Sequence, residues 1–188
     1  MTIRIALLRG INVGGKNKIK MAELKRALTE QGFKEVQTYI QSGNILFASE
    51  EEEGMLGLRM EEVIRREFHL DIPVVLRTAA ELQATAKNCP FTAEEIAAAE
   101  ASSTGECLYV AFLRREPTAE ALERFAAYAN DKELFRVSGR EVYLLFTESV
   151  RNSKLTANLQ RLDAYATVRN WNTVNKLISL AVEMESTK

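Results

Sequence analysis

The chain has 188 residues, 46% of them hydrophobic and 27% charged, which is enough to bury a core without disulfides. The formal net charge of −1 excludes a general electrostatic attraction to nucleic acid or to an anionic membrane, so any such binding needs a local basic patch. The sequence has neither a signal peptide nor a membrane-spanning run, and only two cysteines, so we expect a reduced, cytoplasmic protein without a membrane partner.

The first part of the chain alternates apolar strand patterns with amphipathic helix patterns. Their order is β-α-β-β-α-β, which is the order of the ferredoxin-like split βαβ fold. The turn at Ser42-Gly43 separates the second and third strands. The predicted elements are a strand over 3–8, a helix from Met21 that is stopped by Gly32, strands over 36–41 and 44–47, a helix over 56–68 and a strand over 72–76.

Two capping boxes follow, at Thr78–Glu81 and at Thr92–Glu95, and each predicts the start of a helix. From Glu94 to Glu106 the chain carries acids, no bases and many small residues, which is typical of a linker. We therefore expect a first domain over 1–92, a linker over 93–106 and a second domain over 107–188.

The second domain repeats the pattern of the first. Ser138-Gly139 stands 138 − 42 = 96 residues after Ser42-Gly43, and a similar offset relates Arg169 to Arg77, which indicates an internal duplication. We predict an α+β protein made of tandem ferredoxin-like plaits, two βαββαβ units that are each followed by an extra helix. The elements are strand 108–113, a helix capped by Thr118, strands 134–137 and 142–146, a helix from Ser153, strand 166–169 and a last helix from Val174.

Strands 108–113 and 142–146 are apolar on both faces. The helices of a split βαβ unit cover only one face of its sheet. We therefore expect the other face to be covered by the extra helices, by the sister domain or by a partner.

The strand order of this fold brings two conspicuous stretches together. The exit of the first strand and the hairpin between the second and third strands lie at the same end of the sheet, so residues 9–18 and 41–44 should build one surface. The first stretch is a glycine-rich loop with several cations that leads into a helix, a reasonable cradle for an anion. It is not a P-loop, because Asn17 stands where a Mg²⁺-binding hydroxyl is needed. The alternative is a flexible connection with solvated lysines.

Polar residues of the hairpin and of the last strand–helix junction extend this interpretation. Alternatively, Ser42 and Asn44 only satisfy the turn, an asparagine caps the last helix, and Trp171 is a packing anchor. Arg169 and Trp171 could also bind a phosphate and a flat ring. The candidate ligand-binding residues are Arg9, Gly10, Asn12, Gly14, Gly15, Lys16, Lys18, Tyr39, Gln41, Ser42, Asn44, Arg169, Asn170, Trp171 and Asn172.

Catalytic and metal sites are not indicated. His69 follows an apolar helix face and is interpreted as a helix-end residue, while Cys89 and Cys107 resemble small buried hydrophobic residues. A Ser/His/Asp or Cys/His set is available only if His69 is its base, and a tetrahedral zinc site lacks ligands. The aromatic run of RNA-binding plaits is also absent. We assign no catalytic residue, no metal and no cofactor.

Several motifs resemble the bacterial family named domain of unknown function 1697. They are Leu8–Gly15, Thr38–Asn44, Asn88–Phe91 and Arg169–Val174, and they cover nearly the whole chain in order. The resemblance implies tandem α/β plaits but no activity, because the family's activity is unassigned.

Three hypotheses for the function follow. The first is a binding module for an anionic ligand, a nucleotide or a nucleic-acid backbone, that uses the glycine loop and the hairpin. The second is a transferase or hydrolase that acts on a phosphorylated small molecule, with Tyr39 or a carboxylate as acid or base. The third is an oligomerising or protein-interaction scaffold, and homo-oligomerisation is left open.

Overall fold

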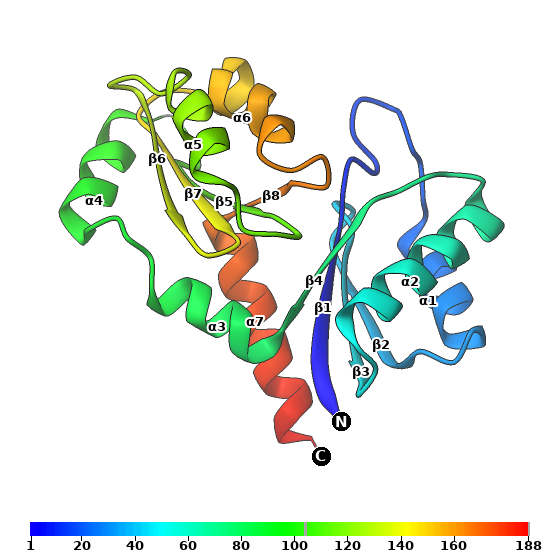
Figure 1. Ribbon diagram of the computed structural model, residues 1–188. Helices are drawn as coiled ribbons and strands as arrows, with labels where there is room; N and C mark the ends of the chain where they lie inside the picture. Colours follow the sequence, from blue (N-terminus) through cyan, green and yellow to red (C-terminus); the bar gives the residue numbers. More distant parts are fainter. Residues whose placement is uncertain (104, 188) are drawn as a thin grey trace. The chain divides into compact units, whose positions relative to one another are not determined.

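The structure is a computed structural model that describes residues 1–103 and 105–187. The chain divides into two compact units, Met1–Gln83 with Asn175–Lys188, and Ala84–Val174. Each unit contains one four-stranded antiparallel sheet with helices packed on it (Figure 1). The protein is therefore of the α+β class.

The first unit contains a sheet with the strand order β2-β3-β1-β4. Leu7 of β1 pairs with Asn44 of β3, so the end of β1 lies beside the start of β3. Glu183 and Met184 of the last helix line the same groove as Lys25 and Val36, which places the end of the chain in this unit. The elements are β1 (Thr2–Leu8), α1 (Met21–Glu30), β2 (Lys34–Tyr39), β3 (Asn44–Ser49), α2 (Glu53–Phe68), β4 (Val74–Thr78), α3 (Ala79–Lys87), which continues into the second unit, and α7 (Trp171–Ser186), which begins there.

Helical spacing explains why α1 and α2 cover one face of this sheet. Met21, Leu24 and Leu28 recur on one side of α1 and are buried against the sheet, where Phe33 meets Phe47 edge to face at 5.3 Å. The opposite face is buried as well. Its apolar members are Ile3, Ile5, Leu7, Leu46 and Val75, and it also contains Arg77, whose side chain is 1% exposed.

The second unit repeats the strand order as β6-β7-β5-β8. Phe125 lies at the centre of its core and meets Phe135 edge to face at 4.9 Å. On the other face of the sheet, Tyr143 is buried and its hydroxyl donates to the carbonyl of Thr85 at 2.7 Å. The elements are α4 (Ala93–Ser102), β5 (Leu108–Phe112), α5 (Ala119–Ala126), β6 (Glu133–Ser138), β7 (Glu141–Phe146), the short 3₁₀ helices η1 (Val150–Asn152) and η2 (Leu159–Arg161), α6 (Lys154–Asn158) and β8 (Thr167–Asn170).

The four helix starts that were predicted from a Thr or Ser cap are confirmed by their hydrogen bonds. Both capping boxes are formed, since Thr78 and Thr92 each exchange bonds with the glutamate three residues later. Thr118 and Ser153 cap α5 and α6. His69 is the C-cap of α2 and has a left-handed conformation with φ 55°. This confirms its interpretation as a helix-end residue.

Several elements differ from the sequence prediction in their limits, since β2 ends at Tyr39, α2 begins at Glu53 and α7 begins at Trp171. The helix expected from Ser153 is broken, because α6 ends at Asn158 and a 3₁₀ turn follows it. The segment expected to be a linker, 93–106, contains helix α4, since its capping box and its alanines favour a helix more strongly than its composition favours a linker. Thr104 of that segment lies outside the described residues.

Arg136 of β6 fixes the start of α4 on the sheet. Its guanidinium donates to both carboxylate oxygens of Glu95, at 2.6 and 2.7 Å, and to the carbonyl of Pro90 at 2.7 Å. The same group lies 4.4 Å from the centre of the Phe91 ring. These bidentate contacts and a bond from the Thr92 backbone amide hold the pKa of Glu95 at about 2.

We expect this clamp to weaken in acid. The folded-state pKa of Glu95 lies below its ordinary value of 4.5, so its contribution to stability is complete above about pH 4.5 and is lost as the pH falls toward 2. The melting temperature of the wild type should therefore exceed that of Glu95→Gln at pH 7, and the difference should shrink between pH 4.5 and 2. In an Arg136→Met background the pH-dependent difference should be smaller, because only the bond from the Thr92 amide remains. A difference that stays constant with pH would contradict the assignment.

Candidate functional site

The glycine-rich loop and the β2–β3 hairpin meet at one end of the first sheet, as predicted from topology. The backbone amide of Leu8 donates to the carbonyl of Gly43 at 2.8 Å, and the side-chain amide of Asn12 donates to the carbonyl of Gln41 at 2.8 Å. We call residues 9–20 and 39–44 the loop–hairpin surface. It lies within the first unit.

Asn12 ties this surface together. Besides its bond to Gln41, its Nδ2 donates to the carbonyl of Ile19, and its Oδ1 accepts from the amide of Ile19, both at 2.9 Å. Further along the loop, the side chain of Asn17 donates to the carbonyl of Gly10, and the amide of Lys16 donates to the carbonyl of Val13. The loop is therefore folded on itself as a short ribbon and is not a loose connection.

The backbone of this surface is unusually rich in left-handed conformations. Of the eleven positive-φ residues in the described part of the chain, seven lie in it, among them Asn12, Asn17 and the β-branched Ile40 at φ 50°. The left-handed conformation is sterically unfavourable for a β-branched residue, so contacts with the surrounding structure must stabilise it at Ile40. Gly43 is required for two reasons. Its φ of 84° is left-handed, and an added Cβ would lie 2.7 Å from the Cβ of Leu8.

The structure separates the predicted ligand residues of this surface into two groups. Asn12 and Asn44 hold the backbone: Asn44 is fully buried, and its Nδ2 donates to the carbonyl of Tyr39 and to the hydroxyl of Ser42. The solvent-facing group consists of exposed residues, with Arg9, Tyr39 and Ser42 half-buried at its border. Its exposed members are Gly10, Gly14, Gly15, Lys16, Lys18 and Gln41.

Lys16 and Lys18 give the surface its charge. Within the described residues, neither side chain forms an ion pair or a hydrogen bond, whereas Lys20 pairs with Glu23 at 3.1 Å. Residues 9–20 contain four cations and no acid. Val13 and Ile40 add two exposed aliphatic side chains that the sequence interpretation had not included in the site; they are 65% and 48% exposed.

The last group of predicted ligand residues lies in the second unit. Arg169 is buried on β8, where its Nη1 donates to the hydroxyl of Thr167 and the carbonyl of Val168, and burial lowers its pKa to about 10. Asn170 caps α7 by accepting from the amide of Thr173. Trp171 is half-buried, and Asn172 donates to the carboxylate of Glu106. Arg169 and Asn170 therefore have internal partners, and Asn172 has an acidic one.

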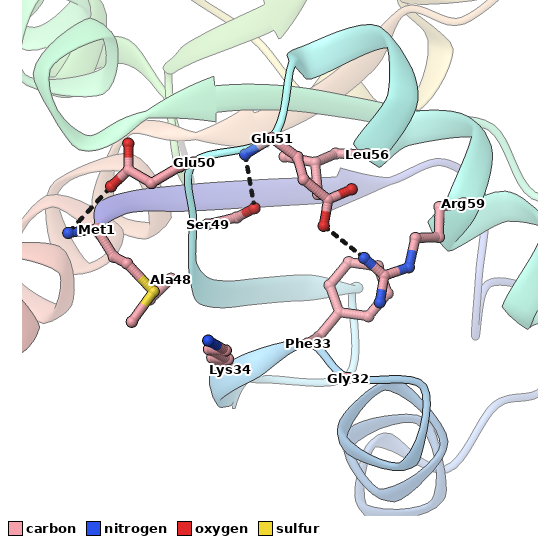
Figure 2. A pocket seen from close by; sticks show the side chains of 10 residues that line it. All are labelled: Met1, Gly32, Phe33, Lys34, Ala48, Ser49, Glu50, Glu51, Leu56 and Arg59. Carbon is pink, nitrogen blue, oxygen red and sulfur yellow. Dashed lines mark hydrogen bonds and ion pairs between the residues drawn. The ribbon is translucent and has the colours of Figure 1, made fainter.

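A cavity of about 370 Å³ lies at the opposite end of the first sheet, where β1 begins and β3 ends (Figure 2). Arg59 lies over the Phe33 ring at 4.5 Å and pairs with Glu51 at 2.6 Å, and the amino group of Met1 pairs with Glu50 at 3.0 Å. These cations are matched by internal carboxylates, so this cavity is less suited to an anion than the loop–hairpin surface. Its lining consists of Met1, Gly32, Phe33, Lys34, Ala48, Ser49, Glu50, Glu51, Leu56 and Arg59.

The fold and the loop–hairpin surface define a class of α+β proteins with one antiparallel four-stranded sheet in each of two units. The chain belongs to the DUF1697 family of proteins of unknown function, whose family model matches residues 1–143. That span includes the whole loop–hairpin surface and ends before Arg169. No described helix is long and apolar enough to cross a membrane.

One solved structure is similar over almost its whole length. It is the conserved bacterial protein SP0830 from Streptococcus pneumoniae, with a TM-score of 0.72 and 24% sequence identity. The similarity covers 96% of this chain and 98% of that chain, and at this identity it supports the fold alone. No curated protein matches the sequence.

Proposed function

We propose that the loop–hairpin surface is a binding site for an anionic, phosphate-bearing ligand, either a nucleotide or a nucleic-acid backbone. The observation that carries this proposal is the pair of exposed lysines, Lys16 and Lys18, on a loop that Asn12 fixes to the hairpin. No carboxylate lies within residues 9–20 or 39–44 to neutralise them.

A fixed loop favours binding for a physical reason. Much of the cost of binding a small anion is the ordering of flexible side chains and loops, and a loop that is already ordered avoids part of that cost. The strained φ of Ile40 supports the same interpretation, because such conformations gather at ligand-binding sites. The exposed glycines at the tip allow a ligand to approach the backbone closely.

The test is a thermal-shift screen of nucleotides, inorganic polyphosphate and short oligonucleotides at low and at physiological salt. A ligand at about 100 times its Kd stabilises the folded state by about 2.7 kcal/mol, which raises Tm by several degrees. We expect a salt-sensitive hit. The double variant Lys16→Ala/Lys18→Ala should abolish most of the shift without lowering the Tm of the free protein, since neither lysine has an internal partner.

The matched control is Lys25→Ala/Lys34→Ala, which removes two exposed lysines of the same unit outside the surface. It should keep the full ligand-induced shift. A shift that survives in the Lys16/Lys18 variant would contradict the proposal, and so would a screen with no hit on folded protein.

We also propose that both units are ferredoxin-like plaits that arose by duplication. The equivalent strand orders, β2-β3-β1-β4 and β6-β7-β5-β8, support this assignment, and each hairpin turn contains a left-handed glycine, Gly43 or Gly139. In this proposal the limits 1–92 and 107–188 assign to each plait the helix that follows it in sequence, and so they differ from the limits of the compact units. A cytoplasmic location is part of the same proposal. The two cysteines are free thiols, which suits a reducing compartment.

A further inference from the structure

A second cavity, of about 510 Å³, lies in the second unit between α4, the start of β5 and the start of α7. It is open to solvent, and its volume falls in the range of about 300–1,000 Å³ that is usual for small-molecule sites. The residues that line it are Ile96, Glu100, Gly105, Glu106, Cys107, Leu108, Trp171 and Asn172.

The charge of this cavity is opposite to that of the loop–hairpin surface. Its lining includes two carboxylates, Glu100 and Glu106, and no lysine, arginine or histidine. Glu106 also accepts a hydrogen bond from Asn172, which orients its carboxylate. Burial raises the pKa of the Cys107 thiol, and the charges of the two glutamates raise it further, so the thiol stays neutral.

Trp171 adds an aromatic wall to this acidic cavity. An indole ring carries negative charge density on its faces and attracts cations that approach them. Ile96 and Leu108 supply apolar surface beside it. An aromatic ring, two carboxylates and aliphatic walls are together the groups that recognise an organic cation, and they repel a phosphate.

We propose that this cavity binds a small organic cation, an ammonium or guanidinium group on a short apolar carrier. Trp171 contacts the cationic group, and Glu100 and Glu106 provide the compensating charge. The cavity shares no residue with the loop–hairpin surface, so a test of this proposal does not depend on the anion site. It also reverses the expectation that Trp171 serves a phosphate-bearing ligand.

Trp171 is the only tryptophan of the chain, so intrinsic fluorescence reports directly on the cavity. The experiment titrates the whole protein with choline, with agmatine and with 3,3-dimethyl-1-butanol, which has nearly the shape of choline but no charge. We expect a saturable change in emission with at least one of the two cations and none with the neutral analogue. Glu100→Gln should also weaken the quenching of Trp171 by caesium and strengthen its quenching by iodide, relative to the wild type.

Variants separate the charge from the shape of the cavity. Glu100→Gln should raise the Kd of the cation about five- to tenfold, because one of two nearby carboxylates is lost. Glu100 is exposed, and a thermal melt of the variant checks that it folds. Glu94→Gln removes an exposed charge from the same helix away from the cavity and should leave the Kd unchanged. The proposal is overturned if neither cation gives a saturable change, if the neutral analogue gives an equal one, if Glu100→Gln leaves quenching by caesium and iodide unchanged, or if the two variants behave alike.

Discussion

Gly43→Ala should destabilise the protein by about 3 kcal/mol, since a left-handed conformation costs a non-glycine residue about 1–2 kcal/mol and overpacking costs about 1–3 kcal/mol. Gly43 has φ 84°, and a Cβ built on it would lie 2.7 Å from the Cβ of Leu8 and 2.8 Å from the Cδ1 of Ile11. Both neighbours are buried, so neither can move aside freely. Urea unfolding followed by circular dichroism measures the loss.

Gly139→Ala is the control, because Gly139 is also a left-handed glycine in a hairpin turn, the one between β6 and β7. Its φ is 59°, but the nearest atom to an added Cβ is the Oε1 of Glu116 at 3.6 Å, an ordinary contact. Gly139→Ala should therefore destabilise the protein by only about 1 kcal/mol, the cost of the left-handed conformation. Equal losses for the two variants would show that the close approach of Gly43 to Leu8 and Ile11 contributes nothing.

Asn12→Ala should cost about 2–4 kcal/mol and loosen the loop–hairpin surface. The substitution removes three side-chain hydrogen bonds, each worth about 0.5–1.5 kcal/mol, and places alanine at φ 54°. Amide hydrogen exchange should become faster across residues 9–20, and any ligand found for Lys16 and Lys18 should bind more weakly although both lysines are intact.

Asn17→Ala provides the comparison within the same loop. Asn17 is also left-handed, at φ 47°, but its side chain makes one exposed hydrogen bond, to the carbonyl of Gly10. The expected loss is about 1–2 kcal/mol. If Asn17→Ala destabilises as much as Asn12→Ala, the tie between the loop and the hairpin is not what stabilises this surface.

Local signals in the sequence were sufficient for most of the fold. Period-2 and period-3.6 patterns located the strands and helices, and Thr-x-x-Glu motifs predicted two helix starts correctly, because each of these features depends on neighbours a few residues away. The break after α6 was missed. Leu155, Leu159 and Leu162 have helical spacing, but nothing in that spacing reveals where the hydrogen-bond pattern changes to 3₁₀.

The candidate site was predicted in position but not in detail. Strand order alone places residues 9–18 beside 41–44. Which residues hold the backbone and which face solvent depends on contacts between residues that are distant in sequence. One such contact joins Asn12 to Gln41, 29 positions away, and the sequence alone does not reveal it. The acidic surroundings of Trp171 were missed for the same reason, since Glu100 is far from it in sequence and Glu106 contacts Asn172 only through the fold.

The division of the first unit between two segments of the chain has a consequence for truncation. Residues 84–174 form a continuous unit, whereas residues 1–83 form a compact unit only together with 175–187. The two segments of the first unit are therefore separated in sequence by the whole of the second unit. A chain cut after Val174 would keep all of the second unit but would lose Leu177, Ala181 and Met184, which are buried in the complete protein.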